Sequence, residues 1–303
     1  MATMLQLMQQ ASVEMGLASP SAVAGNTTID VTQTLALMNA VGYEVQREYQ
    51  WQKLTKEYRF TTQYLTTTGT WTTAAATVTS IPTTAALAAN TWMATGTGIQ
   101  QDTYIVSVDS GTQVTLSQTP TAAGTAAAIT FAQTKYAMPS DFDRLIDRTD
   151  WDKSKHWEML GPETPQQWQW LKSGYISTGP RIRFRPLGGY FQIWPLLSTN
   201  EYLGFEYISN LWVSSSGASA PDKTAFTADT DTCVFPDRLM VLGTKLKYFE
   251  IKGFDTTALA RDYSAQKEIA KANDSGSPTL SMAPRISTVL IGWENIPDSN
   301  YGS

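Results

Sequence analysis

Acidic side chains are concentrated between residues 141 and 163 of this 303-residue chain. The group consists of Asp141, Asp143, Asp147, Asp150, Asp152, Glu158 and Glu163. A pair of carboxyl groups can hydrolyse a glycosidic bond when one is protonated and the other is charged. One hypothesis is therefore a cell-wall glycosidase that uses the acids near residues 141–152. Basic residues interleave with these acids, namely Arg144, Arg148, Lys153 and Lys155. Ordinary ion pairing is the interpretation that we favour.

Other catalytic and metal-binding signals are sparse. His156 is the single histidine, which excludes a cluster of histidine metal ligands and leaves one base for any nucleophilic triad. Cys233 is the single cysteine and cannot form an internal disulfide. The glycines of Gly96-Thr-Gly98 and Gly188-Gly189 lack the lysine and the strand-to-helix context of a phosphate loop. We expect structural roles for His156 and Cys233, and we expect no metal, no cofactor and no enzymatic activity.

Three arginines alternate with apolar residues in the run Arg181-Ile182-Arg183-Phe184-Arg185. In a strand this alternation places Ile182 and Phe184 on one face and the three arginines on the other. The arginines either pair across strands with Glu201 or Glu206, or contact a neighbouring subunit or the phosphates of passing DNA. The net charge of −5 favours contact with protein. Arg181, Arg183 and Arg185 are therefore candidates for a subunit interface or a channel lining.

The arginine run belongs to a predicted antiparallel meander of three strands, over residues 181–185, 190–195 and 202–208, separated by turn residues. Two capping signals precede it. Ser140 followed by Asp143 predicts a helical turn after Pro139, and Thr164 before Pro165 predicts a second helix start. A further strand is expected from Leu54 to Thr62, where apolar and polar residues alternate.

Helices are predicted at both ends of the chain. The first starts at Thr3, whose partner in a capping box is Gln6, and ends at Gly16. The second is a long amphipathic helix capped by Asp30. After a polar linker over residues 214–231, Pro236 begins a third, which Gly253 ends, and Asp255 caps a fourth. We expect the last two to pack as a hairpin against the long helix.

Residues 61–134 differ in composition from the rest of the chain. They are rich in threonine, alanine, serine and glycine, and Asp102 and Asp109 are their only charged side chains. Four runs of strand type, over residues 76–81, 104–108, 113–117 and 128–131, predict a small all-β sandwich or barrel. The flanking segments Tyr58–Phe60 and Tyr136–Pro139 are expected to form a hairpin that carries this insertion at its tip. The ends of the insertion must then lie close together.

The predicted fold class is therefore α+β, a helical bundle with an antiparallel β meander plus an inserted all-β, sandwich-like domain. The core covers residues 1–60 and 135–279, the insertion covers 61–134, and an extended docking tail covers 280–303. Apolar anchors follow each other in this tail without a helical period, and the candidates for docking are Leu290, Trp293, Ile296, Pro297 and Tyr301. The sequence contains no secretory signal and no run of about 18 apolar residues, so we expect no contact with a membrane.

Several segments resemble the head-to-tail adaptor proteins of short-tailed bacteriophages. They are Tyr136-Ala-Met-Pro-Ser-Asp-Phe-Asp-Arg-Leu-Ile-Asp-Arg148, Trp151, Gly161-Pro162, Gln167-Trp168-Gln-Trp170-Leu-Lys-Ser-Gly174, Phe205-Glu-Tyr-Ile-Ser-Asn210, the helix from Pro236 and Asn295-Ile296-Pro297-Asp298. The resemblance covers roughly residues 1–60 and 135–303. The insertion is absent from the simplest members, and its runs Gly96–Ile99 and Val108–Ser117 resemble β-rich modules of phage tail proteins.

The resemblance implies a structural virion protein, made in the host bacterial cytoplasm and located at the head–tail junction. It implies a homo-oligomeric ring, commonly of twelve copies, that lies beneath the portal protein and joins it to a tail or nozzle protein. The genome passes through such a ring, so transient contact with phage DNA is implied as well. A third hypothesis, beside the connector and the glycosidase, is a binding module in which the insertion recognises capsid or host glycan.

Overall fold

The computed structural model describes residues 1–173 and 181–275. The described residues form five α-helices and several antiparallel sheets, so the predicted α+β class is confirmed. They divide into two compact units. The first, the helical unit, contains residues 1–56, 141–145 and 207–275. The second, the strand unit, contains residues 57–140 and the described part of 146–206. None of the described helices is long and apolar enough to cross a membrane.

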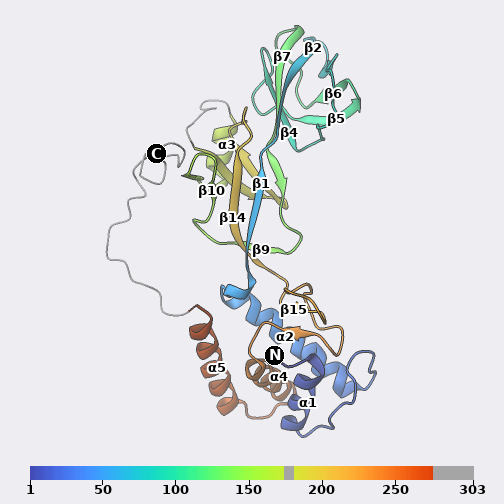
Figure 1. The fold of residues 1–303 in the computed structure, drawn as a ribbon, viewed down its shortest axis with the longest axis vertical. Coiled ribbons are helices and arrows are strands. Elements are labelled where there is room, and N and C mark those ends of the chain that lie inside the picture. The colour runs from blue at the N-terminus through green and yellow to red at the C-terminus, as the bar shows by residue number, and fades with distance from the viewer. Residues whose placement is uncertain (174–180, 276–303) are drawn as a thin grey trace, which may run out of the picture. The chain divides into compact units, whose positions relative to one another are not determined.

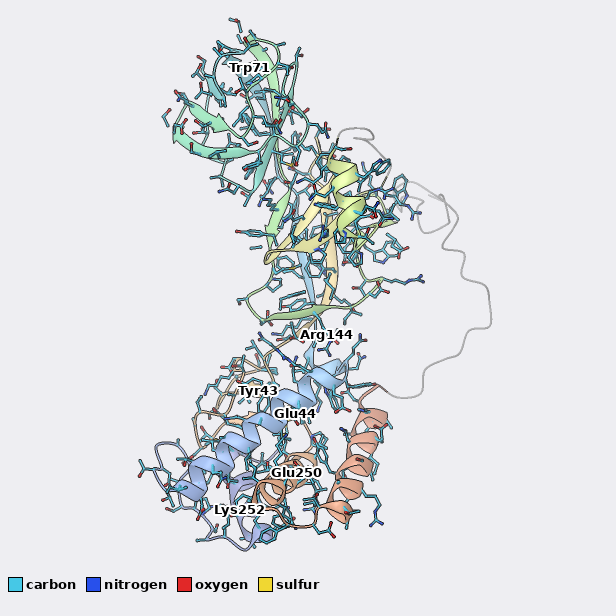
Figure 2. The ribbon with its side chains drawn as sticks, turned by 180° about the vertical axis from the view of Figure 1, so that it is seen from behind. Tyr43, Glu44, Trp71, Arg144, Glu250 and Lys252 are labelled. Carbon is cyan, nitrogen blue, oxygen red and sulfur yellow. The ribbon has the colours of Figure 1, made fainter. Side chains whose placement is uncertain are left out.

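Four helices build the helical unit: α1 (Met4–Met15), α2 (Ile29–Glu48), α4 (Asp237–Lys252) and α5 (Thr257–Ser275). Helix α4 packs against the other three (Figure 1). Its approach to α2 and α5 depends on Gly243, because a Cβ there would lie 2.6 Å from Val41 Cγ1 and 3.0 Å from Tyr263 Cε2. Figure 2 shows Tyr43 and Glu44 on α2, and Lys247 of α4 bonds Glu44 at 2.6 Å. Helix α4 thus packs against both the long helix α2 and the last helix α5.

Most of the predicted helix ends are confirmed. Thr3 and Gln6 form the capping box of α1, and Gly16 ends this helix in the left-handed conformation. Gly253 ends α4 in the same way. The cap predicted for the long helix is wrong, because α2 begins after Thr28 and Asp30 lies inside its first turn. There the carboxylate faces the positive end of the helix dipole, which favours negative charge.

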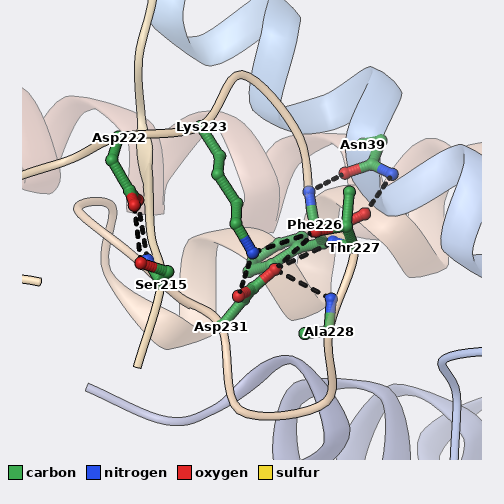
Figure 3. A network of polar contacts seen from close by, with 8 residues as sticks. All are labelled: Asn39, Ser215, Asp222, Lys223, Phe226, Thr227, Ala228 and Asp231. Carbon is green, nitrogen blue, oxygen red and sulfur yellow. Dashed lines mark hydrogen bonds and ion pairs between the residues drawn. The ribbon is translucent and has the colours of Figure 1, made fainter. Parts of the chain in front are cut away.

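The predicted polar linker is wrong, because residues 213–233 form an ordered loop closed at its base. The short strands β15 (Val213–Ser214) and β16 (Thr232–Cys233) pair there. At the centre of the loop the carboxylate of Asp231, which is 0% exposed, accepts hydrogen bonds from Lys223 Nζ at 2.8 Å and from the backbone N–H groups of Thr227 and Ala228 at 2.8 and 2.9 Å (Figure 3). A buried carboxylate is tolerated only when it is paired in this way. The polar composition of this stretch therefore gives no sign of the hydrogen-bonded network inside the loop.

The same loop is attached to α2 through one side-chain amide. Asn39 Oδ1 accepts from the N–H of Phe226 at 2.9 Å, and Asn39 Nδ2 donates to the carbonyl of Phe226 at 3.5 Å (Figure 3). The ring of Phe226 lies edge-on to the indole of Trp212, with 5.2 Å between ring centroids. The loop thus contributes an aromatic side chain to the core of the helical unit.

One sheet contains β1 (Thr55–Thr61), β14 (Tyr202–Ser209), β10 (Trp151–Asp152) and β11 (Trp157–Glu158) in that order, and β9 (Phe142–Leu145) also pairs with β14. A single 3-10 turn, η1 (Gln52–Leu54), precedes β1. The strand predicted over residues 54–62 is confirmed. The helical turn predicted after Pro139 is wrong, because residues 142–145 are the strand β9. Asp141 bonds distant side chains instead of capping a local turn.

A second sheet has the order β12 (Arg183–Leu187), β13 (Tyr190–Trp194), β8 (Lys135–Ala137). The first two strands of the predicted meander are therefore adjacent, as expected, but the third is not. Both edges of β13 are occupied, by β12 and by β8, so the strand over 202–209 joins the other sheet. The expected hairpin of β1 with β8 is also wrong, because β1 pairs with β14 and β8 pairs with β13. Helix α3 (Pro165–Lys172) starts at Thr164 with the predicted cap, completed by Gln167.

Residues 64–133 form a six-stranded antiparallel sheet. Its order is β4 (Trp92–Gly96), β7 (Gly124–Gln133), β2 (Tyr64–Trp71), β3 (Thr77–Thr79), β6 (Gln113–Leu116), β5 (Ile105–Ser110). Ala94 N–H donates to the carbonyl of Thr103 at 2.9 Å, and Met93 bridges Tyr104, so the first and last strands meet and close the sheet. The segments that enter and leave it are adjacent, as predicted, because Gln133 N–H donates to Gln63 O at 2.9 Å. Four strands match predicted runs; β2 and β4 were not predicted.

Within the strand unit, this closed sheet contacts α3 and β13. Met93 of β4 packs in one buried cluster with Trp168, Leu171 and Trp194. Lys172 of α3 also forms an ion pair with Asp102 at 2.8 Å. The closed sheet has a separate core of its own, in which Trp71 is 2% exposed (Figure 2). The contact with α3 is thus a specific apolar and charged interface.

Candidate functional site

The alternation in the arginine run is confirmed. Ile182 and Phe184 are buried, while the backbone of β12 turns Arg183 and Arg185 to the other face, where both are partly exposed. The predicted cross-strand partners are wrong for Arg183, because its Nη1 bonds Glu163 Oε1 at 2.7 Å. Glu163 follows the segment that runs beside β12, and strand alternation alone does not indicate this contact.

The other two arginines of the run differ in their surroundings. Nε of Arg181 is buried and has no hydrogen-bond partner among the described residues. Arg185 forms no ion pair in the part of the chain that the structure describes. It lies opposite Gln192 of β13 in the strand register. Unlike Arg183, Arg185 is therefore free to bind a carboxylate or a phosphate on another molecule.

In the helical unit, the predicted acids Asp141 and Asp143 are held by local contacts. Asp141 accepts hydrogen bonds from Lys56 at 2.7 Å and from Tyr207 and Ser209 at 2.8 Å each. Burial raises the pKa of Asp141, but the hydrogen bonds from Lys56, Ser209 and Tyr207 outweigh it and lower the pKa overall. Asp143 forms an ion pair with Arg144 at 2.8 Å. Asp141 is thus an anchored anion and does not supply the protonated acid that glycoside hydrolysis requires.

In the strand unit, the two buried acids show the opposite shift. Burial, followed by the charges of Asp147 and Glu158, raises the pKa of Asp150 to about 7, and its carboxyl is only 3% exposed. Asp152 is 4% exposed and accepts from the N–H groups of Ser154 and Lys155 at 3.0 and 3.1 Å, and its pKa is raised mainly by burial. A polysaccharide cannot reach carboxyl groups that are covered to this extent.

Two of the segments that carry the phage resemblance meet around Asp141. The segment 136–148 supplies Asp141, and the segment 205–210 supplies Tyr207 and Ser209, which bond its carboxylate. The backbone adds a further bond, from the N–H of Asn210 to the carbonyl of Asp141 at 2.8 Å. Gln46 of α2 donates to Asp143 and to the carbonyl of Ser209, both at 3.3 Å. The two segments therefore form one hydrogen-bonded network with α2.

A pocket of about 630 Å³ opens in the strand unit. Strands β1, β10 and β14 and the turns around β10 supply its lining residues, which are Glu57, Arg148, Thr149, Trp151, Lys153, His156 and Glu206. Hydrogen bonds from Arg59 and Lys153 lower the pKa of Glu57 to about 2, so this carboxylate is charged. In the sequence, no motif links His156 with Arg148. The pairing of β10 with β14, which brings them together with Glu206, has no local signal in the sequence.

The remaining candidates are Cys233, possible metal ligands and the residues proposed for partner docking. Cys233 is buried, and burial raises the pKa of its thiol to about 12, so the reactive thiolate is suppressed. Over residues 1–173 and 181–275, no group of three or more His, Cys, Asp or Glu side chains is placed to hold a metal ion. The candidates for partner docking lie outside the described residues: Leu290, Trp293, Ile296, Pro297 and Tyr301.

No protein-family model matches the chain, and a search of curated proteins finds no match either.

Proposed function

We propose that this chain is a head-to-tail adaptor of a short-tailed bacteriophage. It assembles as a ring beneath the portal protein, joins the portal to a tail or nozzle protein, and leaves a channel through which the genome passes. In this proposal the four helices of the helical unit are the bundle of the adaptor core. The antiparallel sheets belong to the same core, and residues 61–134 are an inserted all-β domain.

The observation that carries the proposal is the network around Asp141. Segments 136–148 and 205–210 are far apart in the sequence, and each resembles the adaptor family on its own. Tyr207 and Ser209 of the second segment donate hydrogen bonds to the carboxylate of Asp141 in the first, and Gln46 attaches both segments to α2. The resemblance therefore concerns a single connected structure, which is more specific than two unrelated short matches. Lys56 neutralises the charge of this carboxylate.

The arginines of β12 supply the proposed contact between copies. Arg185 is partly exposed and forms no ion pair among the described residues, and the chain as a whole is acidic, with a net charge of −5. A cation on one copy therefore meets a predominantly negative surface on the next, which favours contact between different faces of neighbouring copies. Such head-to-tail contacts close into a ring when the rotation between copies allows it.

Electron microscopy of the purified chain with the purified portal protein of the same virus tests the proposal. Rings attached to the portal support it, whereas a chain that stays monomeric and unbound in the presence of portal contradicts it. Arg185→Glu should weaken ring formation through charge repulsion. Arg261→Glu is the matched control, because the side chain of Arg261 is 81% exposed on α5 and lies 3.5 Å from the carboxylate of Asp262.

The glycosidase hypothesis is tested on the same preparation. Incubation with purified bacterial cell walls should leave their turbidity unchanged, because Asp141 and Asp143 form ion pairs and Asp150 and Asp152 are buried. Asp147 is exposed, and it has no second exposed carboxyl group within residues 141–152. Clearance that is lost in Asp141→Asn or Asp143→Asn would instead assign the enzymatic function. The same two variants should keep their binding to portal if the carboxylates act only as structural acceptors for Lys56 and Arg144.

A further inference from the structure

The pocket on β1, β10 and β14 lies beside Gly204, where the side chains of Lys153 and Arg59 come close to the backbone of β14. Gly204 of β14 lies opposite Trp151 of β10 in the strand register. A Cβ at residue 204 would lie 3.0 Å from Lys153 Cε and 3.6 Å from Arg59 Cγ. The side chain of Lys153 crosses this gap and forms an ion pair with Glu57 on β1. Glu57 also pairs with Arg59, so this carboxylate is fully engaged by two cations on this side of the pocket.

The other side of the pocket presents polar groups that have no side-chain partner. Neither the guanidinium of Arg148 nor the carboxylate of Glu206 forms an ion pair or side-chain hydrogen bond within the described residues. The indole of Trp151 is partly exposed and lines the same pocket. An aromatic surface thus lies near one unpaired donor group and one unpaired acceptor group.

Two residues of the lining adopt a backbone conformation that bulky side chains rarely take. The φ angle is +64° at Arg148 and +57° at His156. This left-handed region is unfavourable for non-glycine residues, and such strain concentrates at functional sites. Arg148 itself is exposed, and a glycine at this position would relieve the backbone strain and remove the guanidinium from the lining.

We propose that this pocket binds a pyranose unit of a glycan. The face of Trp151 offers an apolar surface for the C–H groups of the sugar ring, and Arg148 and Glu206 offer a donor and an acceptor for its hydroxyls. A volume of about 630 Å³ lies within the range of small-molecule sites. This proposal does not rest on the proposed adaptor function, and the pocket lies outside residues 61–134.

The charge of the lining decides among ligand classes. Two carboxylates, Glu57 and Glu206, accompany the cations Arg148 and Lys153. A phosphate or a nucleic acid would meet the unpaired carboxylate of Glu206, whose repulsion opposes binding. An apolar ligand would remove the charges of Arg148 and Glu206 from water without pairing them, which is unfavourable. A neutral ligand rich in hydroxyls satisfies donors and acceptors of both signs.

A printed array of bacterial surface oligosaccharides identifies the sugar, and isothermal titration calorimetry with the oligosaccharide that binds best then measures its affinity. Arg148→Gly should reduce the affinity at least about tenfold, because a charged hydrogen bond is lost, and should leave the melting temperature unchanged or higher. Glu206→Gln keeps the shape of the side chain and should also weaken binding. Ser80→Gly is the matched control, since Ser80 has a φ of +57° outside the pocket, and it should leave the affinity unchanged.

Three results would overturn the proposal. The first is an array on which the folded chain binds no oligosaccharide. The second is binding that Arg148→Gly and Glu206→Gln both leave intact, which would place the sugar elsewhere. The third is inorganic phosphate that binds and competes with the oligosaccharide, since the unpaired carboxylate of Glu206 should oppose its binding. A chain that binds sugar but not portal would contradict the adaptor function alone, so the two proposals fail separately.

Discussion

Gly42 of α2 lies directly against the indole of Trp212. A Cβ at residue 42 would meet Trp212 Cη2 at 2.1 Å and Cζ2 at 2.3 Å, well inside the contact distance of two carbons. Trp212 is 0% exposed and forms the centre of an aromatic group with Tyr43, Phe226 and Phe235. The long helix therefore approaches the 213–233 loop only because one of its residues has no side chain.

Gly42→Ala should destabilise the protein by about 2 kcal/mol, although alanine favours helices over glycine. Overpacking a closed core costs about 1–3 kcal/mol, and the rings around Trp212 leave the indole no space to move. Urea denaturation measures the change in free energy of unfolding. Gly111→Ala is the control, because no atom lies within 4 Å of a Cβ at that position. An equal loss in both variants would contradict the steric explanation.

Asp231→Ala should destabilise the protein by about 3–5 kcal/mol, because it leaves Lys223 without its counter-charge and two backbone N–H groups without an acceptor. Asp222→Ala in the same loop should cost much less, since the hydrogen bonds of Asp222 to Ser215 are exposed to water (Figure 3). Urea denaturation compares the two. If both variants lose the same small amount, the buried network does not stabilise the loop.

Sequence signals predicted the elements whose partners are close in the chain. The capping boxes of Thr3 with Gln6 and Thr164 with Gln167 require contacts three residues apart, and both are present. The pair Ser140 and Asp143 has the same spacing, yet residues 142–145 form a strand. Lys56, Tyr207 and Ser209 bind the intervening Asp141 and override the local signal. Long-range contacts of this kind are not visible in a spacing pattern.

The same distinction between local signals and long-range contacts applies to the candidate sites. The alternation of Phe184 with its arginine neighbours was predictable, because side-chain direction in a strand is a local property. The partner of Arg183 was not, since Glu163 is brought to it by the packing of a preceding segment. The polar composition of residues 214–231 predicts a linker. In the structure the buried carboxylate of Asp231 accepts backbone hydrogen bonds that hold this stretch as a loop.

Asp150 should make stability depend on pH in the neutral range. Its folded-state pKa of about 7 lies above the ordinary value of about 4. The protonated carboxyl therefore stabilises the fold below about pH 4, and this contribution, up to about 4 kcal/mol, is lost as the pH rises through 7. Asp150→Asn removes the charge and should be more stable than the natural chain at pH 8, with a smaller difference at pH 4. Melting temperatures across this range measure it.

The control for this titration is Asp262→Asn, which changes an exposed carboxylate of α5, 60% accessible at its side chain. Its melting curve should follow that of the natural chain at every pH. An Asp150→Asn variant whose advantage does not grow between pH 4 and pH 8 would show that Asp150 is already charged in the folded chain.

Replacing residues 64–133 by a short glycine-containing turn should leave a folded chain. The ends of this segment are adjacent, because Gln133 N–H donates to Gln63 O at 2.9 Å, so a few residues can close the gap. The remaining Thr62 and Thr134 keep their backbone bonds to Glu201 and Ile193. The variant should melt cooperatively. An insoluble product or a melt without cooperativity would contradict this expectation.

The same deletion should not be neutral, because it uncovers a specific interface. Met93 is 4% exposed against Trp168 and Trp194, and Asp102 pairs with Lys172 at 2.8 Å. Loss of this apolar cover should cost about 2–3 kcal/mol, the value for burying one large side chain. Met93→Ala in the full chain should reproduce most of that loss, whereas Thr66→Ala, on an exposed strand position, should not. Equal melting temperatures for Met93→Ala and the natural chain would mean that the closed sheet is held to α3 by the ion pair and the chain connections alone.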